Sequence, residues 1–285
     1  MGIYPSQMRF GLHMNKLQKF INYDFRDEKH SKWIFIIPSV VLLAFFALPL
    51  AAIILRSLNL NFFENALSQQ AFKALRLSLL TSSITTLCTA VFGTPLAYIL
   101  ARWKFTHKTW LELILELPIV LPPSVAGVAL LITFGRNGLL GPFFKFFGIS
   151  LPFTTTAVVL AQLFVAAPLF LRSARIGFAH IDQQLEESAR VEGANQWQLF
   201  SEVTLPLSAR ALASGAILTW TRALGEFGAT ILFAGNLEGM TQTMPMAIYL
   251  GFERNIGVAL ALSVVLIFVS VILLMLTKRL EKNKE

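Results

Sequence analysis

The chain has 285 residues, of which 55% are hydrophobic and only 14% are charged, and its mean hydropathy is +0.64. A soluble domain carries about 25% charged residues, so this composition excludes a soluble protein and predicts an all-α integral membrane protein. The net charge of +8 does not indicate nucleic-acid binding, because the cations flank apolar runs and do not gather in an aromatic-interleaved patch.

The N-terminal tail, residues 1–32, is basic and contains no apolar run long enough for a signal-peptide core. We therefore expect it to be retained in the cytosol. The first apolar run, 33–55, can cross the ~30 Å hydrocarbon layer at about 1.5 Å per residue. A polar segment, 56–76, separates it from a second predicted span, 77–100, which ends at a short basic turn.

The third predicted span, 109–134, is interrupted near its middle by Pro118, Pro122 and Pro123 together with Gly127. Proline lacks an N–H and clashes with the preceding turn, so a straight helix cannot run through this point. Carbonyl groups freed at membrane depth are tolerated only against protein or a water-filled cavity. We therefore expect this span to face the bundle interior, with Pro122 and Pro123 lining a pathway. A kinked helix without a functional role is the alternative.

Three further apolar runs complete six predicted spans: 154–171, 206–234 and 256–276. The segment 135–153 contains GPFFKFFG, whose phenylalanines we expect in the outer interface. Most Lys and Arg residues lie in the tail, after the second and fourth spans, and after the sixth. By the positive-inside rule, both termini and the loop between spans four and five are cytoplasmic in a multi-pass plasma-membrane protein. The spans define a transmembrane domain, 33–278, and a C-terminal tail, 279–285.

Between spans four and five lies a wide polar stretch, 175–206, which contains ESARVEGANQWQLFSEVTLP. Asp182 is suited to cap a helix start, and Gly193 then ends that helix. A second helical run, 196–203, leads to Pro206, which can occupy the first turn of the next helix. The stretch predicts a helix–turn–helix elbow.

The spacing within this elbow resembles the EAA loop of permease subunits in bacterial ABC importers, E-A-A-x3-G-x9-I-x-L-P. The matching positions are Glu187, Ser188, Ala189, Gly193, Val203, Leu205 and Pro206. Ser188 and Val203 depart from the pattern by small or isosteric changes. The resemblance implies that this loop couples the spans to a separate ATPase. An amphipathic connector lying on the membrane surface is the alternative.

The strongest polar signal inside a predicted span is TRALGEFGAT, 221–230. Arg222 and Glu226 are four residues apart, so we expect them to pair on one helix face. A charge at the bilayer centre costs about 2.5–3.5 kcal/mol on insertion scales, which indicates a function. One interpretation is a pathway or gate at which Arg222 attracts an anion. The other is a structural ion pair between helices, and both remain open.

Four segments together resemble the molybdate-type permease branch of ABC importers, with sulfate and thiosulfate permeases as close relatives: FGTPLAYILAR, LPIVLPPSVAGVALL, GEFGATILFAGN and TQTMPMAIY. The resemblance covers nearly all of 33–278 and implies a type I ABC importer permease fold with six transmembrane helices. It also implies a homodimer in membrane lipid, an ATP-binding cassette ATPase dimer on the elbow, and an extracytoplasmic oxyanion-binding protein. The implied cargo is molybdate, with tungstate, sulfate and thiosulfate as alternatives.

The chain contains neither a Walker A phosphate loop nor an HExxH zinc motif, and its four histidines lie outside the spans. We therefore expect no catalytic residue, cofactor or metal here, with ATP bound by the partner subunit. An ion-coupled secondary carrier is the alternative of a different class, but carriers usually show inverted repeats and buried carboxylates. A scaffold without a pathway leaves Arg222 unexplained. Importing a dianion against 100 mV costs about 4.6 kcal/mol, which favours an ATP-driven pump.

Overall fold

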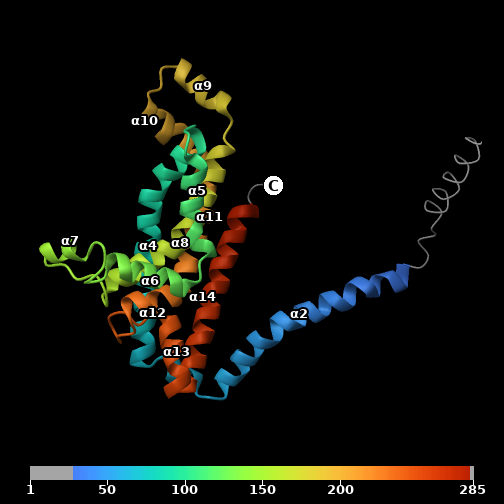
Figure 1. The fold of residues 1–285 in the computed structure, drawn as a ribbon. Coiled ribbons are helices and arrows are strands. Elements are labelled where there is room, and N and C mark those ends of the chain that lie inside the picture. The colour runs from blue at the N-terminus through green and yellow to red at the C-terminus, as the bar shows by residue number, and fades with distance from the viewer. Residues whose placement is uncertain (1–27, 283–285) are drawn as a thin grey trace, which may run out of the picture. The chain divides into compact units, whose positions relative to one another are not determined.

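The computed structural model describes residues 28–282, and all regular secondary structure among them is helical (Figure 1). The chain divides into two units, Met1–Ile53 and Ile54–Glu285. The first contains most of α2 (Glu28–Leu58), which is apolar over Lys32–Leu58 with a mean hydropathy of 2.6. This helix agrees with the first predicted span, whereas most of the predicted N-terminal tail lies outside the described residues.

The second unit contains the remaining helices, which are in chain order α3 (Phe62–Ala66), α4 (Gln69–Arg102), α5 (Lys108–Val120), α6 (Pro123–Phe134), α7 (Gly141–Phe146), α8 (Thr155–Ala179), α9 (Gln183–Val191), α10 (Gln196–Gln198), the π-helical segment η2 (Leu199–Thr204), α11 (Leu205–Leu224), α12 (Gly228–Ala234), α13 (Met244–Arg254) and α14 (Ile256–Lys282).

Four helices of the described chain are long and apolar enough to cross a membrane, namely α2, α4, α8 and α14. The pair α5 and α6, bent by 116°, makes a fifth such segment if it counts as one span. The remaining predicted crossing corresponds to α11, which is 20 residues long but not apolar enough to be counted with these. Since α11 packs against α8 and α4, its buried Ser208 and Thr219 face protein.

Small side chains and hydroxyl groups pack the centre of the bundle, where α4, α8 and α11 meet. Ser173 on α8 donates to the carbonyl of Ala211 on α11 at 2.8 Å. Thr85 on α4 donates to the side-chain oxygen of buried Gln162 on α8 at 3.1 Å. Such small polar contacts allow close helix approach at membrane depth. These three helices form the support on which the loops at both ends are built.

The predicted fifth span, 206–234, is not one helix. Helix α11 ends at Leu224, and α12 begins at Gly228 after a break of three residues, 225–227. The prediction of a continuous span was wrong, because apolar residues continue on both sides of the break and no proline marks it. The predicted break of the third span is confirmed at Pro122 and Pro123, since α5 ends at Val120 and α6 begins at Pro123, whereas Pro118 lies inside α5 and Gly127 inside α6.

Candidate functional site

The polar stretch between α8 and α11 forms the predicted helix–turn–helix elbow. Helix α9 begins after Asp182, whose carboxylate accepts the backbone N–H of Gln184 at 2.9 Å. The helix ends at Val191, and Gly193 follows with a φ of +95°. This left-handed backbone favours glycine, because a Cβ adds a steric cost there. The predicted helix stop at Gly193 is therefore confirmed.

The second half of the elbow begins with a double cap. The side chain of Asn195 accepts the backbone N–H of Gln198 at 2.9 Å, and the Gln198 side chain accepts the N–H of Asn195 at 2.9 Å. Segment η2 follows and runs directly into α11, with Pro206 in the first turn of that helix. These local signals confirm the elbow as a structure, and its coupling role stays a prediction.

The solvent-exposed surface of the elbow combines charged and apolar side chains. Glu187 and Gly193 are exposed, and the exposed fractions of Val191 and Trp197 are 89% and 71%. Exposed apolar side chains gathered on a polar loop are typical of a protein-binding surface. Ser188 donates to the carbonyl of Gln184 at 2.8 Å, so its hydroxyl is satisfied within α9.

The other residues of the EAA pattern lie nearer the bundle. Ala189, Val203 and Leu205 are each half-buried, whereas Pro206 is exposed at the start of α11. Val203 belongs to η2 and Leu205 opens α11. The pattern therefore contains two groups of residues, one on the exposed side of the elbow and one at its junction with the predicted fifth span.

A buried ion pair that sequence reasoning missed attaches the elbow to α4. Arg102, the last residue of α4, donates to Glu186 of α9 at 2.6 Å, and the two side chains are 10% and 6% exposed. Arg102 also donates to the carbonyl of Ile181 at 3.2 Å, and Glu186 accepts the hydroxyl of Thr204 at 3.2 Å. Glu186 is therefore buried in an ion pair, whereas the next residue, Glu187, is exposed on the surface of the elbow.

An aromatic cluster joins α4, α8 and η2. The ring of Tyr98 on α4 makes edge contacts with Phe178 on α8 and Phe200 in η2, with ring centroids 5.6 and 5.2 Å apart. Edge-to-face pairs of this kind contribute about 0.5–1.5 kcal/mol each beyond the burial of area. The junction of the elbow is therefore held by a charged pair and by apolar packing together.

A second ion-pair group joins α8 to α5 on the same side of the bundle. Arg175 contacts Glu112 at 2.5 Å and Glu116 at 3.9 Å. All three side chains are partly exposed, so solvent screens their attraction more than that of the buried pair. This group ties the helix that leads into the elbow to the first half of the interrupted span.

The break between α5 and α6 lies at the surface of the single chain. Pro122 and Pro123 are exposed there, and the expectation that they face an interior is not tested by one chain. The 116° bend turns α6, so that only the stripe of Ala126, Gly127 and Leu130 is buried. Residues of a pathway between two copies would have this exposure, and their role in a pathway stays a prediction.

The predicted pair of Arg222 and Glu226 is confirmed at a distance of 2.7 Å, although not on one helix face. Glu226 lies in the break between α11 and α12, where its side chain is 1% exposed and the Arg222 side chain is 34% exposed. Its other oxygen accepts the backbone N–H of Ala229 at 2.9 Å. Glu226 thus stabilises the break, and it offsets part of the charge of Arg222.

The two helix breaks meet in space. A Cβ placed on Gly228 would lie 2.7 Å from Cβ of Pro123, and one placed on Gly127 would lie 2.8 Å from the carbonyl oxygen of Ala229. These glycines therefore permit α6 and α12 to pack at close range. The structure brings together the proline break and the charged break, which the sequence placed about a hundred residues apart.

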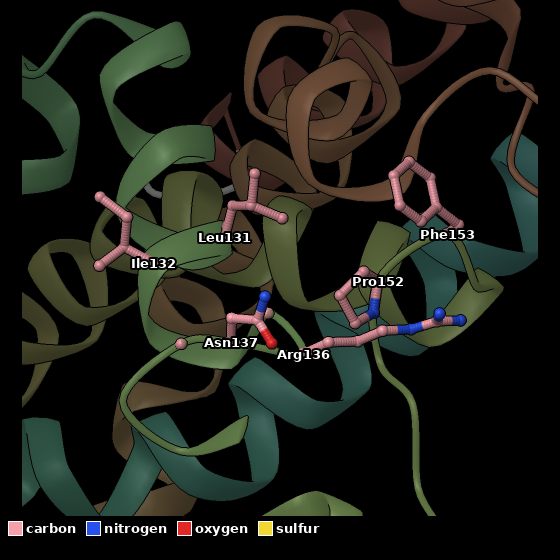
Figure 2. Close-up of a pocket in the computed structure, with 8 residues that line it drawn as sticks. Leu131, Ile132, Arg136, Asn137, Pro152 and Phe153 are labelled. Atoms are coloured by element: carbon pink, nitrogen blue, oxygen red, sulfur yellow. The ribbon is translucent and has the colours of Figure 1, made fainter. Parts of the chain in front are cut away.

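At the other end of α8 from the elbow, the loop 135–153 surrounds two cavities of about 520 and 450 Å³. Both are lined by Gly135, Arg136, Asn137 and Pro152. Figure 2 shows Arg136 extending from the loop after α6 toward Pro152, with Phe153 at the far wall. We call the two cavities and their shared wall the Arg136 recess.

Phe153, which lines this recess, has a left-handed backbone conformation. Its backbone has a φ of +64°, and its side chain is 52% exposed. A residue other than glycine in this region costs about 1–3 kcal/mol and persists only where its surroundings impose it. Here its N–H donates to the carbonyl of Phe233 at 3.4 Å, and Thr154 directly after it caps α8. The sequence carried no signal of this conformation.

Comparisons with known proteins give a consistent result. Residues 93–284 match the family described as "Binding-protein-dependent transport system inner membrane component". The chain is similar to NifC of Clostridium pasteurianum, a probable transport system permease protein, with 38% identity over 232 residues that cover 81% of each chain. It is also similar to ModB of Mycobacterium tuberculosis, a molybdenum transport system permease protein, with 37% identity over 244 residues, 86% of this chain and 92% of that one.

Among solved structures, the chain is similar to a bacterial ABC transporter involved in the import of the acidic polysaccharide alginate. The TM-score is 0.70, and the match covers 94% of this chain and 99% of that one. The sequence identity is 15%, so this likeness is one of fold. It confirms the all-helical, type I permease fold that the sequence resemblance implied.

Proposed function

Because the chain belongs to the family of binding-protein-dependent transport system inner membrane components, we propose that it is the permease subunit of an ATP-driven importer that moves an oxyanion into the cytoplasm. The similarity to a molybdenum permease over 86% of the chain carries the choice of cargo. Molybdate is the proposed substrate, with tungstate, sulfate and thiosulfate as alternatives to be separated by competition.

In this proposal the elbow is the docking site of a separate ATP-binding cassette ATPase. Its exposed face, with Glu187, Val191 and Trp197, supplies charged and apolar contacts. The ion pair of Arg102 and Glu186 then joins that face to α4, and α8 and η2 join it to the bundle. Movement of the ATPase is thereby passed to the spans, which alternate between inward- and outward-open arrangements.

The pathway in this proposal runs past the meeting point of the two breaks, between this chain and a second copy. The exposed Pro122 and Pro123 and the partly exposed Arg222 support this location. A pathway for an anion needs a cation that is accessible from the aqueous side, and Arg222 provides one whose position is fixed by Glu226. The elbow and both termini are cytoplasmic in this arrangement, as the distribution of Lys and Arg predicts.

Reconstitution of the purified complex tests the proposal. Proteoliposomes that contain this chain and its ATPase should accumulate labelled molybdate only when ATP and an oxyanion-loaded binding protein are both supplied. Unlabelled tungstate, sulfate and thiosulfate added in turn would rank the cargoes. Accumulation by the chain alone on an ion gradient would instead establish a secondary carrier, and absence of a copurifying ATPase would refute the importer.

A further inference from the structure

The Arg136 recess lies at the opposite end of α8 from the elbow. Helix α8 runs from Thr155 beside the recess to Ala179 before the elbow, 25 residues in all. At 1.5 Å per residue this is about 37 Å, more than the thickness of the hydrocarbon layer. If the elbow faces the cytoplasm, as the proposed function requires, the recess opens to the other side of the membrane.

We propose that the Arg136 recess receives an acidic side chain of the extracytoplasmic binding protein. This inference rests on the proposed function and goes beyond it by naming the contact. The first support is charge. Arg136 lines both cavities and Lys145 lines the smaller one, and no carboxylate is among the residues that line either.

The guanidinium of Arg136 is held at one nitrogen only. Its Nε donates to the hydroxyl of Ser150 at 3.3 Å, and its two terminal nitrogens have no hydrogen-bond partner in the part of the chain that the structure describes. One nitrogen thus contacts Ser150, and the outer edge of the exposed guanidinium is left to bind. A carboxylate accepts two parallel N–H bonds from this edge, which is the strongest pairing that arginine makes with an anion.

The composition of the wall favours a protein over a free oxyanion. The larger cavity combines Arg136 with the exposed side chains of Ile132 and Phe153. A small tetrahedral oxyanion gains nothing from apolar walls, and two cavities of about 520 and 450 Å³ are far larger than it needs. Arginine beside an aromatic ring is the composition typical of energetically dominant positions in protein interfaces.

The recess is built before any partner arrives. The N–H groups of Leu139 and Leu140 donate back to the carbonyls of Ile132 and Thr133, each at 2.9 Å, and fold the start of the loop onto the end of α6. A preorganised surface loses less entropy on binding than a loop that must first be ordered. The strained backbone of Phe153 serves the same end, since it fixes the ring at the wall of the recess.

Charge reversal tests the contact. Arg136→Glu in the reconstituted complex should weaken binding of the oxyanion-loaded binding protein by about tenfold or more, mainly through faster dissociation. It should also abolish stimulation of ATP hydrolysis by that protein, with the basal rate unchanged. Phe153→Gly, which relieves the backbone and removes the whole side chain, should weaken binding without loss of complex. Arg254→Glu is the matched control, because Arg254 is exposed and lines neither cavity.

The outcomes separate this inference from the proposed function. If the wild-type complex hydrolyses ATP and responds to the binding protein, the importer stands, and an equal response from Arg136→Glu overturns the recess as a docking site. Unchanged binding together with a raised KM for oxyanion would also overturn it, in favour of a free-anion site. A compensating substitution in the binding protein, in which one Asp or Glu is replaced by Arg, would establish the pair if it restored binding to Arg136→Glu.

Discussion

Arg102 and Glu186 fix the elbow to the end of α4, and removal of either side chain should release it. The two side chains are 10% and 6% exposed and lie 2.6 Å apart. Removing one partner of such a pair leaves the other charge buried without a counter-ion, which costs about 3–5 kcal/mol. We expect Arg102→Ala and Glu186→Ala each to raise the opening equilibrium of the elbow about a hundredfold or more, since each 1.4 kcal/mol is a factor of ten.

The double variant separates the charge effect from lost packing. Arg102→Ala with Glu186→Ala leaves no buried charge, so we expect it to be less destabilised than the sum of the two single variants, with a coupling of about 2 kcal/mol. Thr204 still loses its contact with Glu186, so the double variant should not recover fully. The exposed pair of Lys73 and Glu238, at 3.2 Å, is the control, with an expected effect below about 1 kcal/mol.

Hydrogen exchange of the backbone amides in 183–204 measures this opening directly, and copurification of the ATPase reports its consequence. Faster exchange confined to the elbow, with unchanged exchange in the centre of α8, is the expected pattern. Wild-type exchange in both single variants would refute the reasoning. Strictly additive effects in the double variant would show that the two charges do not support each other.

Three further predictions concern the elbow and the helix breaks. Gly193→Leu should reduce ATPase copurification, because the left-handed backbone costs a side chain about 1–2 kcal/mol although the site is open; normal copurification would argue against a coupling turn. Gly228→Val should separate α6 from α12 through its clash with Pro123 and lower the thermal stability of the purified complex, whereas Gly225→Ala, whose Cβ would lie at an ordinary contact distance of 3.7 Å from the carbonyl oxygen of Thr221, should not. Arg222→Ala should lower the rate of oxyanion uptake with assembly intact, and loss of the protein from the membrane would instead indicate a structural pair.

The elbow could be predicted from the sequence because its signals are local. Asp182, Gly193 and Pro206 each act on the backbone within a few residues, and each lies where the sequence indicated. The break of the third span was also predictable, since proline removes an N–H wherever it stands. Signals of this kind do not depend on what packs against them.

The features that could not be predicted depend on partners far apart in the chain. Arg102 resembled a topology signal at the end of a span, and only the fold brings it to Glu186. The positive φ of Phe153 depends on the neighbouring loop. In each case the tertiary contact, and not local propensity, decides the structure.

The π-helical segment has a mechanical consequence. Helix α10, η2 and α11 follow one another without a gap, so a continuous helical segment runs from Gln196 to Leu224, with a length along its path of roughly 40 Å at 1.5 Å per residue. Its near tip carries Trp197 and its far tip adjoins Glu226. If an ATPase docks on the elbow, as proposed, its force would enter this helical segment close to the wide turn of η2. A small tilt there would therefore reach the far tip as a sideways sweep of the charged break.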